Sequence, residues 1–132
     1  MKPPEPLVVF IDRSLGKKVV ANALRDSGYT VEIHDDHFSP DAPDYVWLTE
    51  VSRRGWVVFT KDKKIKHRVA ELHAVVSSAA RVFTLSAGSV QGAEMAQIFV
   101  NAMARIAAYA SENSGPFIMR VSRTGKLLKI YP

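Results

Sequence analysis

The chain has 132 residues, of which 47% are hydrophobic and 23% are charged. This length fits one domain with a single core, and no apolar stretch is long enough to span a bilayer. Cysteine is absent, which excludes disulfides and thiolate metal sites. Because the first residues also do not resemble a signal peptide, we expect a cytoplasmic protein without a membrane segment.

The charges are segregated along the chain. Residues 30–50 hold six acidic side chains and no Lys or Arg, whereas residues 53–68 hold seven Lys or Arg and one acid, Asp62. This separation indicates either two solvated faces or a basic surface beside an acidic site. The net charge of +5 favours anionic partners such as nucleic acid.

Strand and helix signals alternate along the chain. Short apolar or alternating runs predict strands at 7–11, 29–34, 56–60 and 81–85. Apolar residues at helical spacing predict helices at 15–24, 44–54, 65–76 and 93–110. Two further runs around Thr124-Gly125, at 117–122 and 126–131, predict a hairpin.

This alternation predicts a three-layer α/β/α sandwich with a mainly parallel central sheet. We expect one domain over 1–132, with an α/β core at 7–111 and a C-terminal β-hairpin at 117–131. In such sheets ligands bind outside the carboxyl ends of the strands. Acidic residues collect at that edge: Asp12 ends the first strand, Asp35 and Asp36 the second and Asp62 the third, while Asp44 opens a helix there.

Converging carboxylates repel one another unless a cation neutralises them. Their hard oxygen atoms suit Mg²⁺ or Mn²⁺, which can activate a water for attack on a phosphodiester. Nearby basic side chains can hold the phosphate backbone of a nucleic acid. The side chains that we predict to contact it are Arg13, Lys61, Lys63, Lys64, Lys66 and Arg68.

Three segments, 10–16, 35–38 and 55–62, resemble the PIN-like domain family, which includes toxin ribonucleases of bacterial VapBC-type toxin–antitoxin systems. The resemblance extends over about residues 7–85. It implies a Mg²⁺- or Mn²⁺-dependent endoribonuclease that is often a homodimer and is silenced by a cognate antitoxin protein.

By position, the resemblance implies that Asp12, Asp44 and Asp62 are catalytic metal ligands, and that Ser14 and Thr60 orient them. The family's fourth acid is missing from its usual place, which is Lys63-Lys64-Ile65-Lys66 here. Asp36, or its neighbour Asp35, is the predicted replacement.

Other interpretations remain open at this point. Asp12, Asp44 and Asp62 each precede a helical segment and could be helix caps, as could Ser14. Asp12, Asp62 and Ser86 also fit, loosely, a phospho-accepting signalling domain, although Arg13 stands where that class has a second acid. A third possibility is a non-catalytic module that binds RNA or a protein partner, and the missing fourth acid supports it.

Overall fold

The computed structural model describes residues 7–62, 64–88 and 90–132. In these residues a six-stranded sheet has the order β2-β1-β3-β4-β5-β6. Neighbouring strands are parallel except for β5 and β6, which form an antiparallel hairpin. The strands are β1 (Val8–Ile11), β2 (Thr30–Ile33), β3 (Val57–Thr60), β4 (Arg81–Leu85), β5 (Phe117–Val121) and β6 (Leu127–Tyr131). The predicted fold class and C-terminal hairpin are confirmed.

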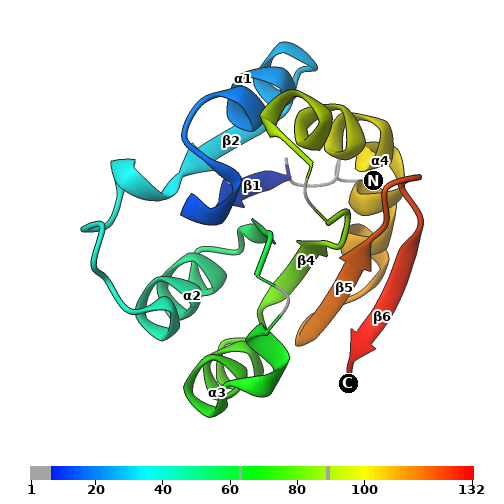
Figure 1. Cartoon of the computed structure of the whole chain (residues 1–132). Coiled ribbons are helices and arrows are strands. Elements are labelled where there is room, and N and C mark those ends of the chain that lie inside the picture. The colour runs from blue at the N-terminus through cyan, green and yellow to red at the C-terminus, as the bar shows by residue number, and fades with distance from the viewer. Residues whose placement is uncertain (1–6, 63, 89) are drawn as a thin grey trace, which may run out of the picture.

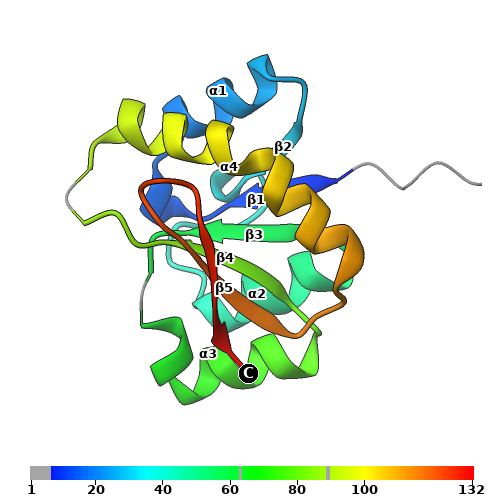
Figure 2. The ribbon, with the colours of Figure 1, turned by 90° about the vertical axis from the view of Figure 1, so that its right-hand side faces the viewer.

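Helices cover both faces of the sheet. They are α1 (Val19–Asp26), α2 (Asp44–Arg53), α3 (Val69–Ser77) and α4 (Gly92–Glu112). Figures 1 and 2 show α1 and α4 on one face and α2 and α3 on the other. Over the described residues, no helix combines the length and apolar character needed to cross a bilayer.

Each face of the sheet has its own hydrophobic core. On the α1/α4 side, the ring of Phe59 stacks on Phe99 with their centroids 4.6 Å apart. On the α2/α3 side, Phe10 packs against Trp47 with their centroids 5.4 Å apart. Strand β3 contributes to both cores and is buried along its whole length, as its apolar run before Thr60 predicts.

Two helices begin later than the sequence predicts. Residues Arg13–Leu15 form a 3₁₀ turn that ends at Gly16, whose φ of 81° stops a helix from continuing. Residues Ile65–His67 form another 3₁₀ turn, and Arg68 is extended before α3 begins. Both turns lie just after parallel strands, at what we call the carboxyl edge of the sheet, where β1 to β5 end. They determine where Ser14 and Arg68 point.

Candidate active site

Asp12 follows β1 at the carboxyl edge, and its carboxylate is held by two hydroxyl groups. Its Oδ2 accepts hydrogen bonds from Ser14 Oγ at 2.9 Å and from Thr60 Oγ1 at 2.7 Å. The residue is only 8% exposed. Its side chain makes no capping hydrogen bond to the following turn. Both hydroxyls donate to Oδ2. The other carboxylate oxygen, Oδ1, has no hydrogen bond within the described part of the chain.

The same hydroxyls hold the chain that leaves β3. Ser14 Oγ accepts a hydrogen bond from the Lys61 amide at 2.9 Å, and Thr60 Oγ1 accepts one from the Asp62 amide at 3.0 Å. Thr60 therefore connects Asp12 to the backbone of Asp62. The Ser14–Asp12 bond is the contact expected from the family resemblance. The alternative that Ser14 caps the next helix is wrong, because α1 begins after Lys18.

Asp62 is paired with an arginine from the beginning of α3. Its Oδ2 accepts a hydrogen bond from Arg68 Nη1, and its Oδ1 accepts one from the Lys64 amide at 2.9 Å. The same Nη1 lies 4.0 Å from Oε1 of Glu71, a side chain that is 16% exposed. One guanidinium thus neutralises part of the charge of two acids, and these bonds raise the pKa of Arg68.

Asp44 completes the group of acids at this edge. It lies in the first turn of α2, where no side chain caps the helix, and its Oδ1 accepts a hydrogen bond from Trp47 Nε1 at 3.0 Å. Burial raises the pKa of the Asp44 carboxyl, and the negative charges of Asp12, Asp62 and Glu71 raise it further. The four carboxylates are therefore close enough to interact electrostatically.

Glu71 is the acid that the sequence interpretation missed. By the family resemblance the usual place of the fourth acid is residues 63–66, which hold no acid, and Asp36 or Asp35 was the predicted replacement. The 3₁₀ turn and the extended Arg68 delay the start of α3, so its first-turn acid returns to the carboxyl edge. The sequence feature that could have identified Glu71 is an acid in the first turn of the helix after β3.

The chemistry of these four acids fits a hard divalent cation, because carboxylate oxygens are the ligands that Mg²⁺ and Mn²⁺ prefer. The pKa of Asp44 is raised first by burial and then by the charges of Asp12, Asp62 and Glu71, both of which a bound cation would offset. Among the described residues, however, no three His, Asp or Glu side chains already stand close enough to hold a metal ion. Arg68 is the cation that binds two of these acids in this conformation.

Comparisons with known proteins identify the family of this chain. The family model described as "PIN like domain" matches residues 7–87, which is more than half of the chain. The chain belongs to the PIN-like domain family. It is also 30% identical, over 117 residues, to a Mycobacterium tuberculosis protein named "Putative ribonuclease VapC45". That alignment covers 86% of this chain and 84% of the relative. No solved structure gives a significant match.

In this PIN-like domain the two acids that follow β2 lie in surroundings that differ from those of the four acids described above. Asp35 pairs with Lys17 Nζ at 2.9 Å and with Arg13 Nε at 3.2 Å, and the hydrogen bond from Lys17 is the main reason that its pKa is lowered. Asp36 is exposed. Neither is among the acids that perturb Asp44. Glu71 is therefore the stronger candidate for the fourth acid, and a metal-binding role for Asp36 stays a prediction.

The predicted RNA-binding residues fall into two groups. Lys64 and Lys66 are exposed and Lys61 is half-buried, and none of the three forms an ion pair with a described residue. Lys63 lies outside the described residues. Arg13 and Arg68 instead pair with acids, and Arg13 also donates a hydrogen bond to the Pro40 carbonyl at 2.8 Å. Their contact with RNA stays a prediction.

Proposed function

We propose that this protein is a metal-dependent endoribonuclease that cleaves phosphodiester bonds in RNA. The observation that most supports it is the arrangement of Asp12, whose carboxylate is fixed by Ser14 and Thr60 beside three further acids. Membership of the PIN-like family and likeness to a protein named a ribonuclease support the same chemistry.

Asp12, Asp44, Asp62 and Glu71 are the residues that would hold Mg²⁺ or Mn²⁺. When bound, such an ion would supply a polarised water and balance the charge that develops on the phosphate. Ser14 and Thr60 keep the Asp12 carboxylate in one orientation, which lowers the cost of arranging the site. Arg68 would exchange its carboxylate partners for the RNA phosphate when the acids bind a metal.

The basic side chains on either side of Asp62 would hold the RNA backbone. Lys61 directly precedes the acid, and Lys64 and Lys66 follow it within a few residues. Since the acids themselves repel RNA, these cations are needed to bring phosphate close to them. A protein with this substrate would act in the cytoplasm.

We also propose that the protein acts as the toxin of a toxin–antitoxin pair. The support is its resemblance to VapBC-type toxins, and the partner would be a cognate antitoxin protein. The family resemblance also favours a homodimer. Co-expression with the product of a neighbouring reading frame, followed by tandem purification, would test the partner. A cleavage activity that such a partner does not suppress would contradict this part of the proposal.

The nuclease proposal is tested with a fluorescent single-stranded RNA. The purified protein should cleave it with Mn²⁺ or Mg²⁺ and stop when EDTA is added. Asp12→Asn and Asp62→Asn should each lower the rate at least about 100-fold while circular dichroism shows an unchanged fold. Asp26→Asn, an exposed acid at the end of α1, is the matched control and should cleave normally. Cleavage that persists in EDTA, or in Asp12→Asn, would contradict the proposal.

The non-catalytic alternative gives a different result in the same assay. It predicts that the wild-type protein binds RNA without cutting it, at any Mn²⁺ concentration. Its main support was the missing fourth acid, and the position of Glu71 weakens that support. The phospho-acceptor alternative loses its basis because the chain is a PIN-like domain. Labelling of Asp62 by acetyl phosphate would restore it.

A further inference from the structure

A pocket lies between the carboxyl end of β4 and the C-terminal hairpin. It has a volume of about 440 Å³ and is lined by Thr84, Ser86, Arg120 and Ile130. A volume of this size is typical of pockets that enclose small molecules or parts of larger ligands. Its lining combines a cation, two hydroxyl groups and an aliphatic side chain.

The sheet register explains why Arg120 faces this pocket. Arg120 is paired with Thr84 on β4 and with Leu128 on β6. Ile118, two residues earlier on β5, is buried in the α2/α3 core. Because side chains two residues apart on a strand share a face, Arg120 lies on that face beyond the core. It is exposed, and within the described residues its guanidinium has neither an ion pair nor a hydrogen bond.

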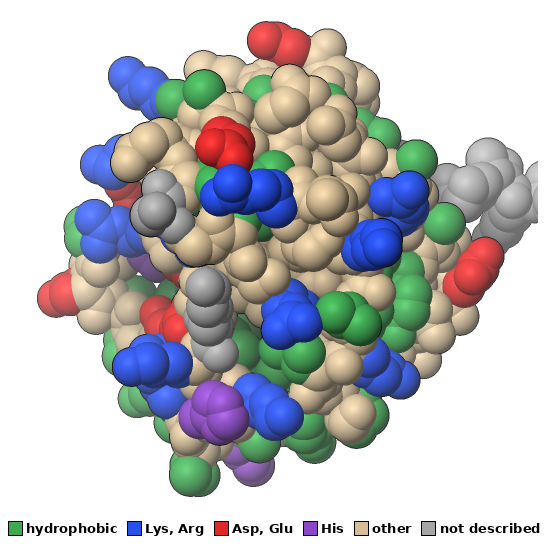
Figure 3. Space-filling model, turned by 45° about the vertical axis from the view of Figure 1, so that its right-hand side comes forward, with side chains coloured by type: hydrophobic (Ala, Val, Ile, Leu, Met, Phe, Trp, Pro, Cys, Tyr) green, Lys and Arg blue, Asp and Glu red, His purple; other side chains and the backbone are tan. Residues whose placement is uncertain are grey.

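The pocket is connected to the candidate active site. Thr84 Oγ1 donates a hydrogen bond to the backbone carbonyl of Asp62 at 3.1 Å. Strand β5 lies two strands from β3 in the sheet. At the usual spacing of neighbouring strands, Arg120 is therefore roughly 10 Å from the end of β3, which Asp62 follows. Figure 3 shows that Lys and Arg side chains outnumber acidic ones on the face that includes the hairpin.

We propose that this pocket binds one nucleotide of single-stranded RNA next to the bond that is cut. Arg120 would bind its phosphate, and the hydroxyl of the half-buried Ser86 would contact its sugar, while Thr84 connects the pocket floor to Asp62. Ile130 and the half-exposed Leu128 would support its base. This inference rests on the proposed ribonuclease function. It gives the C-terminal hairpin a role in holding the substrate.

Single-stranded RNA fits this surface better than an acidic peptide. A carboxylate ligand would use only the cation, whereas a nucleotide offers a phosphate, a hydroxylated sugar and an apolar base face to the three kinds of group present. Asp62, whose carbonyl Thr84 contacts, lies within the segment of Lys61, Lys64 and Lys66, so a strand held by these lysines would reach the pocket.

The test compares two variants of the same hairpin, Arg120→Gln and Lys129→Gln. Both remove one positive charge, but Lys129 is opposite Met119, which packs in the α1/α4 core, so Lys129 faces away from the pocket.

Binding of a fluorescein-labelled unstructured RNA is measured by anisotropy in EDTA, which prevents cleavage. Arg120→Gln should weaken binding about tenfold, as expected for one charge-assisted hydrogen bond. The salt slope should fall by about 0.7, the value for one lost contact to a single strand. Lys129→Gln should bind within about twofold of wild type.

Each outcome separates this inference from the nuclease proposal. If wild type cleaves RNA with Mn²⁺ but Arg120→Gln binds as tightly as wild type, only the pocket assignment is overturned. If wild type does not cleave, yet binding depends on Arg120 and not on Lys129, the pocket assignment stands and the nuclease proposal fails. If polyglutamate displaces the RNA at equal charge concentration and binds through Arg120, the pocket belongs to an acidic protein partner and the inference is overturned.

Discussion

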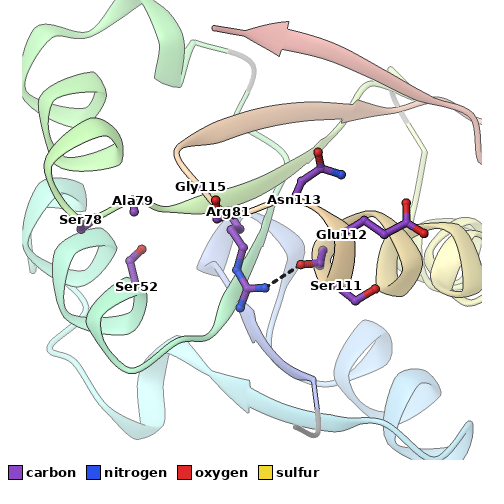
Figure 4. Close-up of a pocket in the computed structure, with 10 residues that line it drawn as sticks. Ser52, Ser78, Ala79, Arg81, Ser111, Glu112, Asn113 and Gly115 are labelled. Carbon is purple, nitrogen blue, oxygen red and sulfur yellow. Dashed lines mark hydrogen bonds between the residues drawn. The ribbon is translucent and has the colours of Figure 1, made fainter. Parts of the chain in front are cut away.

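The two edges of the sheet each have an arginine among helix ends, but the two side chains have different partners. At the carboxyl edge, Arg68 binds the carboxylates of Asp62 and Glu71. At the opposite edge, Arg81 donates to the backbone carbonyl of Gly55 at 2.7 Å and to that of Ala110 at 3.1 Å. Figure 4 shows Arg81 in the polar pocket of about 560 Å³ at that edge.

This difference indicates that Arg81 has a structural role, whereas Arg68 can exchange its partners. Arg81 binds backbone carbonyls near the ends of α2 and α4, and a neutral carbonyl pair does not attract a metal ion in its place as carboxylates do. Burial lowers the pKa of the Arg81 guanidinium. Under the proposed function, the carboxylates that bind Arg68 have an alternative partner of higher charge, a divalent cation. We therefore expect substitutions of Arg81 to affect folding and substitutions of Arg68 to affect metal binding.

The largest expected effect is on stability at the edge of Arg81. Arg81→Met leaves two carbonyls without their charged donor and should lower the free energy of unfolding by roughly 3 kcal/mol. Arg68→Met, the matched control, should lower it by less than about 1 kcal/mol because its ion pairs are partly exposed. Urea denaturation in EDTA measures both. An equal loss of unfolding free energy in the two variants would contradict a structural role that Arg81 has and Arg68 lacks.

Metal binding should depend on an acid of the carboxyl edge. Glu71→Gln should weaken Mn²⁺ binding about tenfold, or about 1.4 kcal/mol, because it removes one charged ligand. Glu112→Gln, which removes an acid at the opposite edge, is the control and should leave Mn²⁺ affinity unchanged. Isothermal titration calorimetry measures the affinities. If Glu71→Gln binds Mn²⁺ as wild type does, Glu71 is not the fourth acid.

Removing charge from the acid cluster should stabilise the metal-free protein. Asp44→Asn keeps an oxygen acceptor for Trp47. It removes the cost of burying a charged carboxylate and the repulsion with three acids, so we expect a gain of about 1 kcal/mol at neutral pH.

The difference in stability between Asp44→Asn and wild type should depend on pH. Because the folded-state pKa of Asp44 lies above 3.8, its charged form destabilises the fold at neutral pH. As pH falls through the raised pKa, the carboxyl is protonated and the penalty disappears, so the two stability curves should converge below about pH 4. A difference that stays constant from pH 7 to pH 4, measured by urea denaturation, would rule out this electrostatic explanation.

The smallest effect concerns competition between Arg68 and a metal ion. Arg68→Gln removes a cation that neutralises Asp62 and Glu71, so Mn²⁺ should bind about threefold tighter, as expected for losing a partly exposed ion pair. Arg54→Gln, which breaks the exposed pair with Glu50 on α2, should not change the affinity. Weaker Mn²⁺ binding by Arg68→Gln would mean that Arg68 organises the acids and does not compete with the metal.

Local sequence was sufficient for the strands, the order of layers and three of the four acids. Buried strands have continuous apolar runs, and a polar residue directly after such a run must lie at the edge of the sheet, so Asp12 and Asp62 could be placed without coordinates. Asp44 followed from the start of α2 in the same way.

Only the tertiary structure decided how these residues interact. The 3₁₀ turns after β1 and β3 depend on the packing of the chain as it leaves the sheet, and periodicity of side chains does not report them. They turn Ser14 towards Asp12 and bring Glu71 and Arg68 to the same edge. Asp35 looked equivalent to the other acids in sequence, yet Lys17 and Arg13, which precede α1, neutralise it. Strand ends are local properties, whereas the partner of a charge depends on distances between segments far apart in the chain.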